Sequence, residues 1–157
     1  MKNHEIFELR NTLNELVNVK GKSFAYAIYK NMEALDKEIE LINKVKKETP
    51  QEFIDYENER TLLCIKYSDK DDDGNPLIVQ VNGTPSYKIT NTDKFEKEFS
   101  KVKDKYAQVL VDKRESDAEF DKFLDSDNDV VLKKVSIEDL PDDITASFID
   151  KIKHMLS

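Results

Sequence analysis

The chain is poor in cysteine, glycine and histidine, and it contains no tryptophan. Its single cysteine, Cys64, cannot form an internal disulfide, which excludes a small secreted scaffold held together by disulfides. Three isolated glycines cannot build a glycine-rich phosphate-binding loop. The two histidines, His4 and His154, lie near opposite ends of the chain and have no cysteine or histidine at ligand spacing. We therefore expect neither a zinc site nor a phosphate loop.

Long hydrophobic runs are missing as well. No segment approaches the roughly 20 consecutive apolar residues that a helix needs to cross a bilayer. The first residues include charged side chains, and no apolar run of signal-peptide length follows them. We therefore expect no membrane partner and a protein that stays in the cytoplasm of the cell that makes it.

Acidic residues outnumber basic ones. The 157 residues include 33 acidic and 25 basic side chains, which gives a net charge of -8. Nucleic-acid binding depends mostly on Lys and Arg that neutralise phosphates, so this balance disfavours direct binding to nucleic acid. A charged fraction of 37% beside a hydrophobic fraction of 38% favours long helices with solvated outer faces. The length fits a single helical domain over residues 1–157.

Two segments carry hydrophobic residues at alternating steps of four and three. The first contains Ile28, Met32, Leu35, Ile39 and Ile42, and the second contains Phe95, Phe99, Val102, Tyr106 and Val109. This spacing places the apolar side chains along one narrow seam of a helix, which is typical of helix-to-helix packing. We predict a mainly α (α+β) fold in which long antiparallel helices pack along coiled-coil-like seams.

The ends of the expected helices are marked by residues with known positional preferences. Gly21 predicts the end of a first helix over residues 3–19. Asp93 opens a capping-box pattern at the start of the helix that carries the second seam. This helix either continues through Phe123 or gives way to a separate helix that starts at Ser116.

A small β-hairpin is expected between the two seams, over about residues 77–89 and at one end of the helices. Asn82-Gly83 is the strongest short signal for a hairpin, because a type I′ turn needs positive φ at both central residues. Pro85 lacks a backbone donor, so the second strand is expected at an edge of the sheet. Residues 130–135 are a candidate for a third strand.

The sharpest local motif is Asp69-x-Asp71-x-Asp73-Gly74, which matches the first half of an EF-hand calcium loop. The match fails at Pro76 and again at Gln80, which stands where a bidentate Glu closes such a site. We favour a polar turn before the hairpin, because Asp, Gly, Asn and Pro are the residues of turns. Calcium bound by Asp69, Asp71 and Asp73 is the alternative, and no other cofactor is expected.

No cluster of residues in the sequence forms a catalytic signature. Asp125, Asp127 and Asp129 repeat the alternation of carboxylates without the glycine, which is more typical of an acidic loop at the end of a helix. An enzyme that uses a carboxylate-bound metal would need this loop and the Asp69 motif to converge on one cation. We therefore expect a protein without enzymatic activity.

Several segments match a known pattern in their order along the chain. They are LNEL (13–16), FAYAIYKN (24–31), YENER (56–60), KDDDGNP (70–76), YKI (87–89) and FEKE (95–98). Together they resemble a family of small proteins, a domain of unknown function, encoded by tailed phages and prophages. The resemblance covers roughly residues 6–140 and implies a viral origin and a soluble accessory role. It favours a turn for the acidic segment and brings no activity and no site residues.

We predict a non-enzymatic protein-interaction protein of a phage that serves virion structure or assembly. Its partners would be other proteins of phage or host, and leftover apolar residues would form the partner surface or a homo-oligomer contact. It would lie in the host cytoplasm, with the virion as the alternative. The alternative function is an inhibitor of a host defence or host enzyme, acting through an acidic surface or by mimicry of nucleic acid. That surface would be carried by Glu33, Asp36, Glu38 and Glu40, interrupted by Lys37, together with the acidic residues from Asp69 to Asp73.

Overall fold

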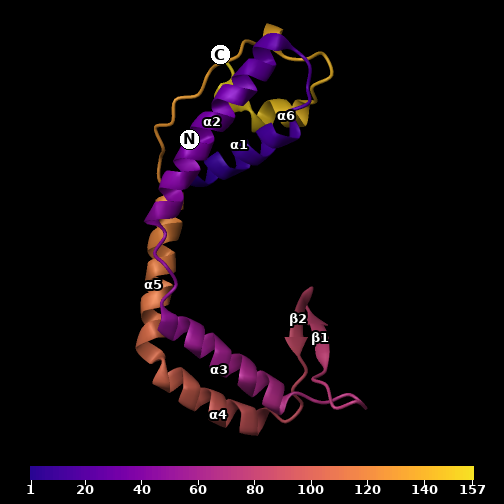
Figure 1. Ribbon diagram of the computed structural model, residues 1–157, viewed down its shortest axis with the longest axis vertical. Coiled ribbons are helices and arrows are strands. Elements are labelled where there is room, and N and C mark those ends of the chain that lie inside the picture. Colours follow the sequence, from indigo (N-terminus) through magenta and orange to yellow (C-terminus); the bar gives the residue numbers. More distant parts are fainter. The chain divides into compact units, whose positions relative to one another are not determined.

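The computed structural model describes residues 1–157 and contains six α-helices, two short 3₁₀ helices and a two-stranded antiparallel sheet (Figure 1). The chain divides into two compact units. The terminal unit contains Met1–Lys47 and Ala118–Ser157, and the central unit contains Glu48–Asp117. The fold is mainly helical with a small hairpin, which confirms the predicted α+β class. That residues 1–157 form one domain stays a prediction.

The terminal unit is a set of helices around a continuous hydrophobic core. Its complete elements are α1 (Asn3–Glu15), α2 (Lys22–Val45), η1 (Ile137–Asp139), α6 (Ala146–Lys151) and η2 (Lys153–Met155). Helix α1 packs against both α2 and α6. Its hydrophobic residues recur at steps of three and four, which places Ile6, Leu9 and Leu13 on one buried stripe.

The first predicted seam faces this core. Ile28, Leu35 and Ile42 of α2 are buried, and Met32 and Ile39 between them are partly buried against the same cluster. The cluster also contains residues of α1 and of the C-terminal segment, so the side chains of α2 are covered from more than one direction. The seam therefore packs within its own unit.

The sequence misplaces the break between the first two helices. Helix α1 ends at Glu15, four residues earlier than predicted, and a turn follows in which the N–H of Val19 donates to the carbonyl oxygen of Leu16. Gly21, with φ of 121°, is the residue that caps the start of α2 rather than the end of α1. Its positive φ explains why a glycine stands at this position.

Residues 130–135 do not form a third strand, because the sheet has only two. This segment belongs to the terminal unit and runs beside α2. The buried side chain of Asn31 holds it: Nδ2 donates to the carbonyl oxygen of Lys133 at 3.0 Å, and Oδ1 accepts from the N–H of Lys133 at 2.7 Å. Val135 then pairs with Leu156 in a single parallel bridge. A side-chain amide thus replaces the neighbouring strand that a sheet would provide.

The central unit contains two helices, the hairpin and the first part of a third helix. Its elements are α3 (Gln51–Tyr67), β1 (Ile78–Val81), β2 (Thr84–Tyr87), α4 (Thr92–Lys105) and the beginning of α5 (Ala107–Leu124). The hairpin stands where the sequence predicts it. Asn82 and Gly83 have φ values of 51° and 79°, as a type I′ turn requires.

The second predicted seam packs against α3. The ring of Phe95 lies 6.2 Å from that of Tyr67, and the ring of Tyr106 lies 5.8 Å from that of Tyr56. The helix does not continue through Phe123, nor does a new one start at Ser116, because α4 ends at Lys105 and α5 begins at Ala107. At this break the hydroxyl of Tyr106 donates to Oε1 of Glu59 at 2.9 Å, which ties the junction to α3.

Candidate protein-interaction site

The acidic motif before the hairpin folds as a turn closed by one of its own carboxylates. Oδ1 of Asp71 accepts from the backbone N–H of Asp73 at 3.0 Å and from that of Asn75 at 2.7 Å. The pKa of Asp71 lies below its ordinary value, chiefly because the N–H of Asn75 donates to the ionised carboxylate. Gly74 completes the turn at φ of 83°. This arrangement is the polar turn that the sequence favours.

Asp69 joins that turn to the base of the hairpin. Its N–H donates to the carbonyl oxygen of Lys88, and its own carbonyl oxygen accepts from the N–H of Leu77, both at 2.8 Å. Its carboxylate accepts from the hydroxyl of Thr90 at 2.6 Å and from the N–H of Thr90 at 3.2 Å. The Thr90 hydroxyl is the main reason why the pKa of Asp69 is lowered. Asp69 therefore clamps the three chain segments that meet below the two strands.

The remaining acidic residues of the motif stay open to solvent. The carboxylates of Asp72 and Asp73 are exposed and accept no hydrogen bond from the protein. No group of three or more His, Cys, Asp or Glu side chains in the structure is arranged to hold a metal ion. Calcium binding by Asp69, Asp71 and Asp73 stays a prediction, and the first two of these carboxylates have the structural partners described above.

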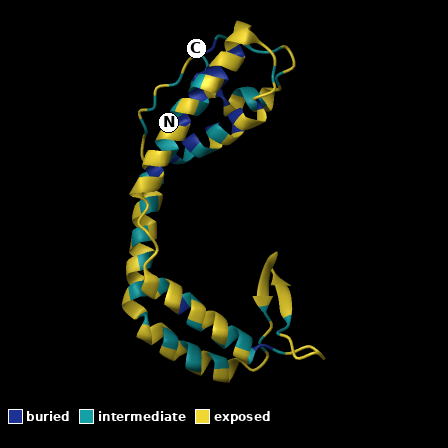
Figure 2. Ribbon diagram, viewed as in Figure 1, coloured by how far each residue is buried: buried dark blue, intermediate teal, exposed yellow.

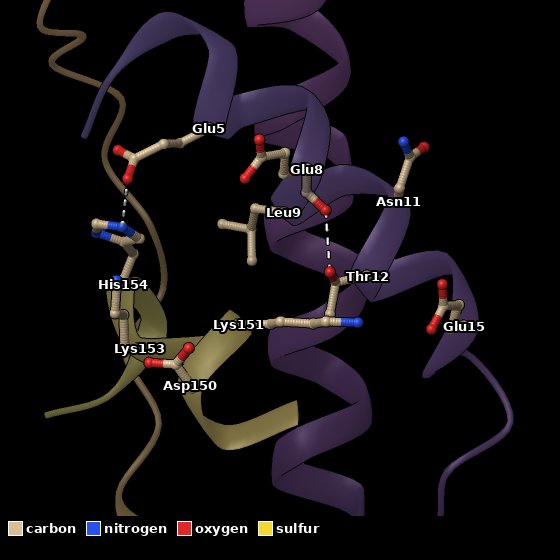
Figure 3. A pocket seen from close by; sticks show the side chains of 10 residues that line it. All are labelled: Glu5, Glu8, Leu9, Asn11, Thr12, Glu15, Asp150, Lys151, Lys153 and His154. Atoms are coloured by element: carbon tan, nitrogen blue, oxygen red, sulfur yellow. Dashed lines mark hydrogen bonds and ion pairs between the residues drawn. The ribbon is translucent and has the colours of Figure 1, made fainter. Parts of the chain in front are cut away.

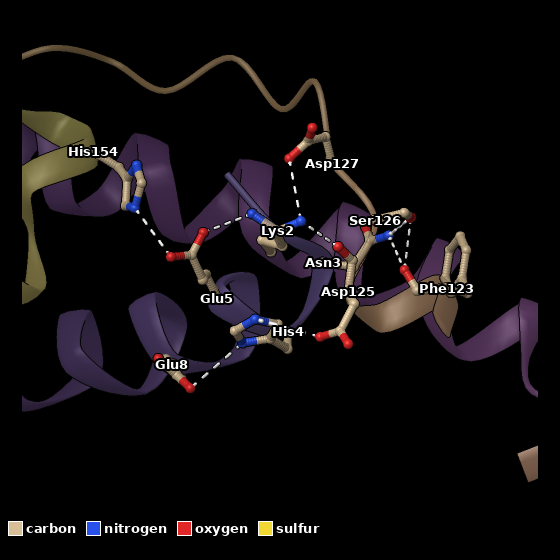
Figure 4. Close-up of polar contacts among 10 residues, drawn as sticks. All are labelled: Lys2, Asn3, His4, Glu5, Glu8, Phe123, Asp125, Ser126, Asp127 and His154. Carbon is tan, nitrogen blue, oxygen red and sulfur yellow. Dashed lines mark hydrogen bonds and ion pairs between the residues drawn. The ribbon is translucent and has the colours of Figure 1, made fainter. Parts of the chain in front are cut away.

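The second acidic loop lies in the terminal unit and is held by basic residues near the N-terminus (Figure 4). Asp125 lies 3.9 Å from Nε2 of His4, and Asp127 lies 3.9 Å from Nζ of Lys2. Nearby, the side chain of Asn3 donates to the carbonyl oxygen of Phe123 at 2.8 Å. These contacts connect the start of α1 to the end of α5, so the acidic side chains of this loop stabilise the fold of the terminal unit.

A cavity of about 420 Å³, lined mostly by polar and charged residues, lies beside the contact between α1 and the C-terminal helices (Figure 3). Glu5 and His154 point toward each other across it, with 3.7 Å between Oε1 and Nε2. The other oxygen of Glu5 accepts from the backbone N–H of Lys2 at 2.6 Å, which is the main reason why the pKa of Glu5 is lowered. Glu5 thus caps the N-terminus of α1, where a negative charge is favourable.

The central unit fully buries almost none of its hydrophobic side chains. Tyr56 is its single buried hydrophobic residue, and the residues of the second seam are only partly buried. The ribbon of α3 and α4 is accordingly almost all in the colours of intermediate and exposed residues (Figure 2). On α3, Ile54 is 42% exposed and Leu62 is 64% exposed. These two residues are eight positions apart and so lie on the same side of the helix. The exposed, polar Asn58 lies between them, so α3 presents two separate apolar side chains that the chain itself leaves uncovered.

The hairpin adds exposed apolar side chains on both of its faces. Ile78, Val79 and Val81 of β1 are exposed, and Tyr87 is the only residue of the two strands that is partly buried. No residue from 74 to 87 is charged, although charged residues make up 37% of the chain. That uncharged run is the sequence signal that could have pointed to these exposed side chains, and sequence reasoning used it only to predict the strands.

Comparison with family models, with curated proteins and with solved structures finds no match to this chain. None of its helices is both long enough and apolar enough to cross a membrane.

Proposed function

We propose that the protein is a non-enzymatic interaction protein whose central unit binds another protein. The observation that carries this proposal is the contrast between one buried hydrophobic residue, Tyr56, and the uncovered apolar side chains of α3 and β1. Apolar area that leaves water on binding contributes about 25 cal/mol per Å². A partner laid over Ile54, Leu62 and the hairpin would therefore supply the burial that the central unit lacks.

We further propose a role in the structure or assembly of a phage particle, with phage proteins as the partners. Several segments resemble, in the same order along the chain, a protein family encoded by tailed phages and prophages, and this resemblance supports a phage origin. The helical seams and the highly charged surface are in keeping with an accessory protein that works by contact. Host cytoplasm or the virion is the corresponding location.

The proposal is tested by affinity purification of the tagged full-length chain from phage-infected cells, with mass spectrometry of the captured proteins. Leu62→Glu places a charge at the more exposed of the two apolar positions on α3. Leu41→Glu is the matched control, because Leu41 is a leucine of α2 in the terminal unit that is 53% exposed. We expect portal, tail or capsid proteins with the wild-type chain and the control, and their loss with Leu62→Glu.

Two results would overturn this proposal. Capture that both variants leave unchanged would show that the central unit is not the binding part. Recovery of a host nuclease, polymerase or defence protein in place of phage proteins would replace assembly with inhibition.

Inhibition through an acidic surface remains the alternative function. Lysines of α2 neutralise part of its proposed acidic face. Glu33 pairs with Lys30 at 2.9 Å, and Glu40 pairs with Lys44 at 2.7 Å. These pairs are typical of an ordinary solvated helix face. We therefore place assembly first.

A further inference from the structure

The free edge of β1 presents unpaired backbone groups. The strands pair Ile78 with Tyr87, Val79 with Ser86, Gln80 with Pro85 and Val81 with Thr84. Hydrogen-bonded and non-hydrogen-bonded pairs alternate along an antiparallel ladder. The N–H of Lys88 donates to the carbonyl oxygen of Leu77 at 2.9 Å, so the next pair, Ile78 with Tyr87, is of the non-hydrogen-bonded kind. The N–H and C=O groups of Ile78 and Gln80 therefore point away from β2.

The two edges of the hairpin differ in their capacity to accept another strand. Pro85 occupies the outward-pointing position of β2 opposite Gln80 and has no N–H to offer. Proline on an edge is one of the devices by which natural sheets block pairing. Strand β1 has no proline, no charged residue and no bulge. It is therefore the open edge.

The side chains of β1 suit an added strand. Ile78 is 60% exposed and Val81 is 52% exposed, and both are residues that favour strands. An isolated two-stranded hairpin is marginally stable in water, whereas three or more strands with an apolar face can be stable. A third strand beside β1 would complete main-chain hydrogen bonds and place side chains next to Ile78 on one face of the hairpin and next to Val81 on the other.

The charge around the start of β1 indicates which kind of strand fits. The turn that leads into β1 carries Asp72 and Asp73, whose carboxylates have no partner. Its one lysine, Lys70, is committed elsewhere, because its Nζ donates to the carbonyl oxygen of Ile65 at 2.7 Å and to Oγ of Ser68 at 3.2 Å. A strand that ends beside this turn with Lys or Arg would balance the charge. An antiparallel second copy of β1 would place the uncharged Asn82-Gly83 turn there instead.

We propose that the edge of β1 binds an extended segment of a partner protein, with apolar residues at alternate positions and a basic residue at the end beside Asp72 and Asp73. This mode is β-strand addition, in which main-chain hydrogen bonds give affinity and side chains give specificity. The inference rests on the proposed function and names the part of the central unit that takes the partner's chain.

The test is a titration of the full-length chain against a fluorescent peptide with alternating Thr and Val and two lysines at each end, followed by anisotropy. A second peptide carries glutamates in place of the lysines. Gln80→Pro removes a backbone N–H of β1 that points away from β2. We expect binding to weaken by about tenfold, because the added strand loses one main-chain hydrogen bond and meets a proline ring at the edge. Ser86→Pro cannot serve as a control, because the N–H of Ser86 points toward β1 and its removal would weaken the hairpin itself. Ser86→Thr is the control, because it changes a residue of the other strand without adding charge or removing an N–H, and it should leave binding unchanged.

The role of charge is tested by reversing the charge of the protein's acidic turn and comparing the lysine peptide with the glutamate peptide. Asp72→Lys with Asp73→Lys should weaken the lysine peptide by about threefold, the size expected for exposed ion pairs, and should strengthen the glutamate peptide. Nuclear magnetic resonance of the Asn82 and Gly83 amides shows whether each variant keeps its hairpin. If Gln80→Pro loses the turn, Ile78→Lys replaces it as the edge variant.

The outcomes separate this inference from the proposed function. Peptide binding that the edge variants do not weaken, or equal binding of both peptides, would overturn the inference. A dimer of the chain that Gln80→Pro dissolves would assign the edge to a second copy and also overturn it. If the peptides do not bind while Leu62→Glu still abolishes capture of phage proteins, strand addition fails and the proposed function stands.

Discussion

The terminal and central units use the same kind of helical seam with different results. In the terminal unit, seam residues such as Leu35 are fully buried, and they join a cluster to which α1 and the C-terminal segment also contribute. In the central unit, seam residues such as Phe99 remain partly exposed, because α3 is the one helix that packs extensively against α4. A heptad pattern thus specifies which side of a helix is apolar. The number of neighbouring elements decides how far that side is buried.

The largest expected effect comes from removing a core side chain of the terminal unit. Leu35→Ala should lower the free energy of unfolding by about 2–5 kcal/mol, because it leaves a cavity in a closed core. The matched change Leu63→Ala removes the same atoms from a partly buried position of α3 and should lower it by about 1 kcal/mol. Urea unfolding followed by circular dichroism measures both. Equal losses of unfolding free energy in the two variants would contradict the difference in burial between the units.

A smaller effect is expected from Asn31→Ala. This change leaves the N–H and C=O of Lys133 without their partner, which should cost about 1–3 kcal/mol. Hydrogen exchange of the Lys133 amide should become faster, while that of the hairpin amides stays the same. Asn14→Ala, at an exposed position of α1, is the control. Unchanged exchange at Lys133 would mean that the Asn31 contacts do not hold the extended segment.

Gly83→Ala tests the central unit by itself. An added Cβ would meet no atom within 4 Å, so the substitution acts only through the positive φ of 79°. We expect a cost of about 1 kcal/mol, seen as faster amide exchange in β1 and β2 and no change at Lys133. Gly83→Asn should restore most of the protection, because asparagine tolerates this conformation. Equal effects of the two variants would contradict a strain confined to the turn.

The smallest expected effect is faster amide hydrogen exchange at the base of the hairpin at acidic pH. The folded-state pKa of Asp69 lies below that of the unfolded chain, so its ionised carboxylate stabilises the hairpin base above the unfolded-state pKa of about 3.9. That stabilisation is lost as the pH falls through the folded-state pKa. Exchange of the Leu77 and Thr90 amides should therefore accelerate below about pH 4 relative to intrinsic rates.

Asp69→Asn should remove most of this pH dependence, whereas Asp72→Asn should leave it in place because Asp72 accepts no hydrogen bond. A pH profile that survives Asp69→Asn would assign the effect to Asp71, whose pKa is also lowered by hydrogen bonds.

Sequence reasoning located the hairpin and both seams, because each depends on short-range patterns. Asn82-Gly83 admits few turn types, and hydrophobic spacing identifies a helix face whatever lies against it. It failed at residues 130–135, whose apolar run resembles a strand but is paired with the side chain of Asn31. It also missed the break at Tyr106, where the tie to Glu59 joins residues far apart in the chain.

The candidate site was only partly visible in the sequence. The Asp69 motif was singled out for its carboxylates, yet the role of Asp69 depends on Leu77, Lys88 and Thr90, which come later in the chain. By itself the sequence determined the helical class, the turn and the acidic balance, because these follow from local preferences and composition. Only the tertiary structure decided which apolar residues are covered. Burial depends on how many segments converge on a side chain, and no local pattern contains that number.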